Sequence, residues 1–311
     1  MTGVQGAIRR EDYGFFGPGS PSWKVWTAPT ALIGFQRAVV LEHFDPALAA
    51  AVADSSGIYR DPSGRLDRTL AYFLTVAVAD GRTAVEASDA LMRVHARATG
   101  IEPITGRRYS ANNPASQLWI HITGWHSVLK CYEIYGPGPL APAEESRYWA
   151  EARIAAELQT CKPADVPASR DEVRQYFADV RGGLCTSERA ERALRYLLWT
   201  PLHKGVRLWA GSRLLAPAAI ATLPKWMRQL GGFDQVAAVD AGVRPAARAL
   251  VRGFSVNNSR PMLALARVLV PHTAEVFAQH LAADTPALPR TVTPAEARER
   301  VHVLGQPASA R

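Results

Sequence analysis

The sequence predicts an all-α fold, a single multi-helix globular domain built around a central buried helix. Hydrophobic residues make up 48% and charged residues 21% of the 311 residues, a composition typical of compact domains. The period-2 alternation of β-branched residues that marks strands is nearly absent. Apolar residues instead recur at helical spacing between capping residues and glycines, the usual signals for where helices begin and end.

Residues 1–30 are expected to form an N-terminal arm, because "FFGPGSPSWKVWTAPTA" is rich in glycine, proline and tryptophan. The helical domain is expected over residues 31–285. One early helix lies in "DPALAAAVADSSG", where Asp45 is the predicted N-cap, Pro46 takes the first helical position and Gly57 follows the end.

Two further helices follow closely in the chain. "RLDRTLAYFLTVAVADG" places apolar side chains on one face and ends at Gly81. Thr83 and Glu86 form a T-x-x-E capping box, which predicts the start of a second helix that stops at Gly100.

The segment "QLWIHITGWHSVLKCYEIYG" is predicted to be the central, heavily buried helix, because large apolar residues recur in it at helical spacing. Several helices rich in alanine, arginine and leucine come after it. Residues 286–311 are expected to form one more helix, opened by Thr293 and Glu296, and a frayed tail.

The net charge of +8 raises the question of a nucleic-acid partner. The arginines are scattered through helical segments without a run of five, so solvated helix faces are the favoured interpretation and no nucleic acid is predicted. The three cysteines, Cys131, Cys161 and Cys185, form no CxxC pair and are read as small buried residues in a reducing compartment.

The beginning of the chain lacks the apolar core of a signal peptide, and its longest apolar stretch is too short to cross a bilayer. These observations predict a cytoplasmic protein without a transmembrane segment. Peripheral membrane contact is compatible with them.

His95 is the first candidate for chemistry, because it projects from a mainly apolar stripe with Leu91 and Met92. The commoner interpretation is a core histidine that is hydrogen-bonded to the backbone or to a carboxylate. The alternative is a ligand for a metal or a haem iron, since neutral imidazole binds both.

Arg65, Arg68, Thr69 and Tyr72 recur at helical spacing and share one stripe beside the apolar face of their helix. An ordinary solvated basic face is the simpler interpretation of this stripe.

No other constellation competes with His95. His121 and His126 lie five residues apart, which points them about 140° away from each other on an ideal helix. HExxH, GxSxG and a P-loop are absent, and no carboxylate cluster accompanies the histidines. A haem is the cofactor for which one protein ligand is enough.

Four stretches in order carry a resemblance to a known family: "LEHFDPALAAAVADSSGIYRDPSGRLDRTLAYF", "VHARATG", "YSANNPASQLWIHIT" and "YGPGPLAPAEESRYWAE". Together they resemble the catalytic domain shared by the MpaB-type oxygenases and the latex clearing proteins, which are bacterial rubber oxygenases. The similarity runs from about residue 33 to at least residue 180.

The resemblance implies an all-α, oxygenase-like domain that holds a non-covalent haem b and uses dioxygen. It implies that His95 is the proximal ligand of the iron, with Leu91 and Met92 packed against the porphyrin. Arg65, Arg68 and Thr69 then lie over the pocket as catalytic residues, and the two arginines also contact the cofactor.

The chain departs from the family at Arg68, where the family's R-x-x-K-T segment has a lysine. A forked, permanently charged guanidinium is better suited to a haem propionate or a polar substrate group than to binding iron. The leading hypothesis from the resemblance is a haem b-dependent oxygenase or related oxidoreductase acting on an apolar small molecule. A non-catalytic haem or lipid carrier and an interaction protein with an empty apolar core are the alternatives.

Overall fold

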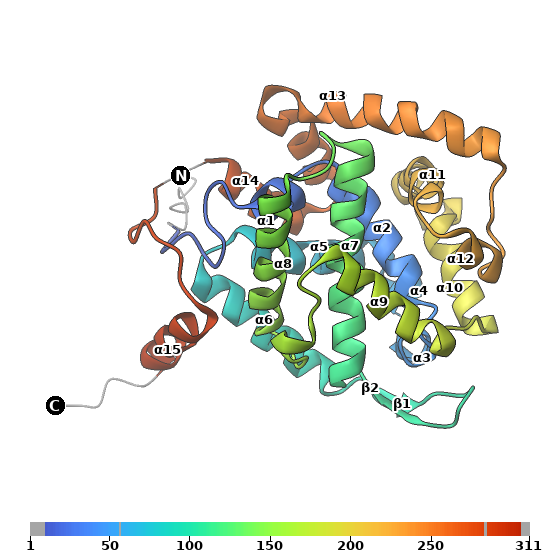
Figure 1. Cartoon of the computed structure of the whole chain (residues 1–311), viewed down its shortest axis with the longest axis horizontal. Helices are drawn as coiled ribbons and strands as arrows, with labels where there is room; N and C mark the ends of the chain where they lie inside the picture. The colour runs from blue at the N-terminus through green and yellow to red at the C-terminus, as the bar shows by residue number, and fades with distance from the viewer. Residues whose placement is uncertain (1–9, 56, 283–284, 306–311) are drawn as a thin grey trace.

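The predicted all-α class is confirmed by the structure, a computed structural model that describes residues 10–55, 57–282 and 285–305 (Figure 1). The α-helices are α1 (Pro21–Trp26), α2 (Thr30–Glu42), α3 (Pro46–Ser55), α4 (Gly57–Arg60), α5 (Pro62–Val78), α6 (Gly81–His95), α7 (Pro114–Tyr135), α8 (Pro142–Ala156), α9 (Arg170–Val180), α10 (Glu188–Leu198), α11 (Val206–Ala221), α12 (Lys225–Leu230), α13 (Ala237–Leu269), α14 (Pro271–Ala282) and α15 (Pro294–Gly305). Short 3-10 helices are η1 (Pro163–Asp165), η2 (Arg181–Gly183) and η3 (Leu202–Lys204).

Helix α7 is the central buried helix that the sequence predicts, and it lies beside α2 (Figure 1). The side chain of Asn113 caps its first turn by accepting hydrogen bonds from the backbone of Ala115 and Ser116. Gly34 on α2 allows the two helices to approach closely, because a Cβ atom at this position would lie 2.6 Å from Cα of Val128.

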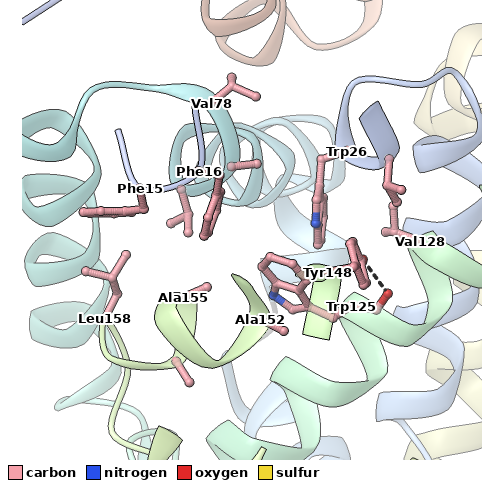
Figure 2. Packing of buried hydrophobic residues seen from close by; sticks show 14 of the residues in the cluster. Phe15, Phe16, Trp26, Val78, Trp125, Val128, Tyr148, Ala152, Ala155 and Leu158 are labelled. Carbon is pink, nitrogen blue, oxygen red and sulfur yellow. Dashed lines mark hydrogen bonds between the residues drawn. The ribbon is translucent and has the colours of Figure 1, made fainter. Parts of the chain in front are cut away.

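The largest core cluster lies where α7 meets α1, α5, α6 and α8, and Figure 2 shows part of it. The rings of Trp26 and Trp125 cross edge to face with centroids 5.4 Å apart, and Tyr148 donates a hydrogen bond to the carbonyl of Trp125. Phe15 and Phe16 are buried in the same cluster. The described part of the expected arm, from residue 10 onward, thus contributes side chains to the core.

Helices α5 and α6 are present, but the boundaries of α6 differ from those predicted. Asp80, not Thr83, caps the first turn of α6, with its side chain accepting from the backbone of Thr83. The helix ends at His95. The residues after it form a short antiparallel hairpin of β1 (Thr99–Ile101) and β2 (Arg108–Ser110), which has too few residues for a recognisable strand pattern.

The C-terminal helices return to the first half of the domain. The buried carboxylate of Asp67 on α5 accepts hydrogen bonds from the backbone of His272 and Thr273 and so caps α14. Helix α13 is broken at residues 256–259, where Asn257 and two neighbouring residues adopt positive φ angles. The predicted capping box of Thr293 and the glutamate three residues later opens α15.

No helix in the described ranges is long and apolar enough to cross a membrane.

Candidate functional site

A cavity of about 240 Å³ lies between α2, α5, α10, α11 and the second part of α13. Most of its lining side chains are aliphatic or aromatic, and they come from segments far apart in the chain. The apolar stripe of α2 forms one wall, the first half of α5 a second, and the end of α13 a third. Apolar lining residues include Leu32, Phe35, Val39, Leu66, Leu208 and Leu265. A concave apolar site of this kind is the usual form of a small-molecule pocket.

Three residues that line this cavity each have a buried polar atom without a hydrogen-bond partner among the described residues: Gln36 Oε1, His43 Nε2 and Tyr196 Oη. The amide nitrogen of Gln36 donates to the carbonyl of Leu197 at 3.2 Å, which leaves its oxygen free. Such atoms are costly to bury unpaired, so they indicate where a ligand with hydrogen-bond donors is stabilised.

His43 is 4% exposed and has one defined tautomer. Its Nδ1 lies 2.6 Å from the carbonyl oxygen of Val39, which can only accept, so Nδ1 carries the hydrogen. Burial lowers the pKa of His43 to about 4, with a smaller contribution from the charge of Arg65. The ring is therefore neutral at pH 7, and Nε2 is a hydrogen-bond acceptor without a partner among the described residues.

Glu42, beside His43, adds an ionisable carboxyl group to the same wall. Burial raises the pKa of Glu42 to about 7, while the positive charge of Arg65 opposes that rise. The hydroxyl of Thr123 lies 3.5 Å from Glu42 Oε1. A carboxyl group with this pKa both gains and loses a proton near neutral pH.

Two of the three predicted catalytic residues line the cavity, namely Arg65 and Thr69. The Arg65 guanidinium donates to Ser55 Oγ at 3.1 Å, and the Thr69 hydroxyl donates to the backbone carbonyl of Arg65 at 2.8 Å. Burial lowers the pKa of Arg65, which Glu42 partly restores.

Arg68 lies elsewhere, since its side chain is 65% exposed and is not among the residues that line the cavity. Both of its terminal nitrogens lie 3.2 Å from Oδ2 of Asp61, the N-cap residue of α5. In this structure Arg68 is part of a solvated ion pair.

His95 lies half-buried at the last residue of α6 and does not line the cavity. Burial, and then the charge of Arg65, lower its pKa, which favours the neutral ring. The Gln117 amide nitrogen lies 2.5 Å from the carbonyl of Ala111 and 3.3 Å from Nδ1 of His95. That nitrogen therefore faces Nδ1, which accepts, and Nε2 carries the hydrogen.

The side chains of His95 and Arg65 are of the kinds that bind haem. One neutral imidazole is enough to bind the iron, and a guanidinium pairs well with a propionate. Iron at Nε2 would replace the hydrogen that this tautomer carries. Leu91 and Met92, the predicted packing residues, are half-buried on the same helix as His95 and do not line the cavity.

The other histidines of the central helix contact groups of the protein itself. His121 Nε2 contacts the backbone carbonyl of Ala152 at 2.8 Å inside the core. His126 Nδ1 lies 3.4 Å from a guanidinium nitrogen of Arg37. In the described part of the chain no group of three or more His, Cys, Asp or Glu residues could hold a metal ion.

Gln36, Glu42 and His43 were not singled out from the sequence. A signal for two of them existed, because Gln36 and His43 fall on the stripe that Leu32, Phe35 and Val39 define at helical spacing. Polar residues on an otherwise apolar stripe mark either a satisfied core position or a pocket. Only the three-dimensional arrangement distinguishes these two cases.

Comparison with protein families gives one match. Residues 23–256 match the family described as ER-bound oxygenase mpaB/B'/Rubber oxygenase, catalytic domain. The matched range contains α2, α5, α6 and most of the cavity walls. No curated protein and no solved structure matches the chain.

Proposed function

The chain belongs to the mpaB and rubber oxygenase catalytic-domain family, and we propose that it is a haem b-dependent oxygenase acting on an apolar small molecule. The apolar cavity carries this proposal, because its size and lining suit such a substrate. Arg65 supports it further, since this residue lines the cavity and also lowers the pKa of His95 by its charge.

In the proposed enzyme His95 binds the haem iron and Arg65 contacts a propionate, with Leu91 and Met92 packed beside the cofactor. A haem bound there would supply the redox-active iron needed for dioxygen chemistry. The protein supplies binding, orientation and electrostatics.

The cavity side chains have separate proposed roles. The aliphatic walls exclude water and bind the apolar body of the substrate. His43 Nε2 and Gln36 Oε1 accept hydrogen bonds and therefore orient a substrate that bears a hydroxyl or N–H group. Glu42 holds or releases a proton near neutral pH, and Arg65 stabilises its ionised form.

The absorption spectrum of the purified protein, expressed with a haem precursor, tests the proposed ligand. Wild-type protein is expected to show a strong Soret band, and His95→Ala is expected to lose stoichiometric haem. His43→Ala is the matched control, because it removes the other imidazole near Arg65. A band kept in His95→Ala and lost in His43→Ala would overturn the assignment and move the iron to His43.

A second candidate function is a non-catalytic haem or lipid carrier. The exposed ion pair between Arg68 and Asp61 favours it, because the residue that takes the place of the family's lysine does not line the cavity. Oxygen uptake by the reduced holoprotein with apolar substrates separates the two functions. Uptake that depends on the substrate supports the oxygenase, and slow autoxidation alone supports the carrier.

A further inference from the structure

A second concave site, of about 400 Å³, lies between α2, α7, α9 and α12. It shares no lining residue with the apolar cavity and faces a different side of α2. Its lining combines basic side chains, notably Arg37, Lys130 and Arg181, with the aromatic rings of Phe177 and Trp226. We refer to it as the basic cleft.

Arg37 is the most informative residue of the basic cleft, because it is only 3% exposed and has no carboxylate within ion-pair distance among the described residues. One terminal nitrogen donates to Ser127 Oγ at 2.7 Å and lies 3.4 Å from His126 Nδ1, and Nε has no partner. Burial lowers the pKa of Arg37 only to about 10, so the guanidinium is charged at neutral pH. A buried cation without a counter-charge is strongly unfavourable.

The remaining charges of the basic cleft do not neutralise Arg37. The acidic residue that lines it, Glu133, has both carboxylate oxygens bound by Arg170 at 2.5 and 3.3 Å. Lys130 has no ion pair in the part of the chain that the structure describes, and Arg181 stacks over the ring of Trp226 at 4.4 Å. Arg37, Lys130 and Arg181 therefore line one concave site, and no protein carboxylate among the described residues pairs with any of them.

We propose that the basic cleft is a binding site for an organic anion, a phosphate or carboxylate group carried on a planar apolar body. Guanidinium groups bind both kinds of oxyanion through paired hydrogen bonds, and a lysine adds a point charge. Phe177 and Trp226 offer flat apolar surfaces for the body of the ligand. The inference does not depend on the haem or on oxygenase activity.

Three matched probes test the proposal by isothermal titration of the full chain: 1-naphthyl phosphate, 1-naphthoate and 1-naphthol. The two anions are expected to bind at least about tenfold more tightly than the neutral alcohol, with affinities that fall as salt is raised. Comparison of the two anions shows whether the site prefers a phosphate or a carboxylate. Equal binding of 1-naphthol and the anions, or no binding of either anion, would overturn the proposal.

Lys130→Met assigns the binding to the basic cleft, because Lys130 is partly exposed and its replacement leaves the core intact. The variant is expected to lose about tenfold in affinity for the anion. Lys162→Met is the matched control, since this lysine is exposed and does not line the cleft. Equal losses of affinity in the two variants would mean that binding depends on the net charge of the protein alone, and would overturn the assignment to the basic cleft.

Arg37→Met gives an independent measurement of the same site. If Arg37 binds the anion, the variant without ligand is expected to melt at the same temperature as wild type or at a higher one. 1-Naphthyl phosphate should then no longer raise the melting temperature of the variant. A structural arginine held by Ser127 predicts the reverse, a lower melting temperature with the stabilisation by ligand intact. That result would overturn the role given to Arg37.

Discussion

Replacing Asp67 by alanine should destabilise the domain by about 2–3 kcal/mol, because one carboxylate caps a helix more than two hundred residues away in the chain. Asp67 accepts from the backbone nitrogens of His272 and Thr273 at 2.9 and 2.8 Å, and from the Thr273 hydroxyl at 2.8 Å. Each hydrogen bond to a charged group contributes about 1.5–3 kcal/mol. Water can hydrogen-bond to the freed groups at the exposed first turn of α14, so the expected loss is smaller than the sum of the individual hydrogen bonds.

Equilibrium unfolding in urea, followed by tryptophan fluorescence, measures the change. Asp67→Asn retains one acceptor and should lose about half as much free energy of unfolding. Asp61→Ala is the control, because Asp61 caps α5 at an exposed position and should cost only about 1 kcal/mol. A loss below about 0.5 kcal/mol for Asp67→Ala, the range of ordinary surface changes, would refute the capping role.

Three further predictions concern the cavity wall and its support. The pKa of Glu42 is about 7 in the folded protein, above its unfolded value. As the pH rises from 4.5 to 7, the free energy of unfolding of wild type should therefore fall by roughly 3 kcal/mol relative to that of Glu42→Gln. His43 has a folded pKa of about 4, below its unfolded value, so wild type should lose stability relative to His43→Phe as the pH falls from 6.5 to 4. Urea unfolding at several pH values across these ranges checks both predictions. They would be contradicted if the free energies of unfolding of wild type and variant changed in parallel with pH. Gly34→Ala should lower the free energy of unfolding by about 2 kcal/mol, because its Cβ meets the backbone of Val128; an unchanged urea midpoint would contradict this.

The class of the fold and its central helix could be predicted from the sequence because they depend on local patterns. Helical spacing of apolar residues and the absence of strand alternation are properties of short windows, and both hold in α7. The β1 and β2 hairpin was not predicted, since three residues per strand give no measurable alternation. The burial of Phe16 likewise depends on a distant partner, because its ring packs edge to face against that of Trp125 on α7, with centroids 6.0 Å apart.

The candidate site was predictable only in part. Arg65 and Thr69 were found as neighbours on one helix face, and both line the cavity. That Arg68 pairs with Asp61 depends on where α5 begins, which periodicity alone does not determine. Gln36 and His43 are recognised as cavity residues only when the positions of α5, α10 and α13 are known. The assignment of haem to His95 stays a prediction.

Gln36 and Arg37 are consecutive residues of α2, and they face the two different concave sites. A single helix is thus a shared partition between two binding compartments. Any rotation or translation of α2 that accompanies occupancy on one side alters the geometry on the other. Thermodynamic linkage then requires reciprocity: the factor by which an anion changes the affinity for an apolar ligand equals the factor by which that ligand changes the affinity for the anion.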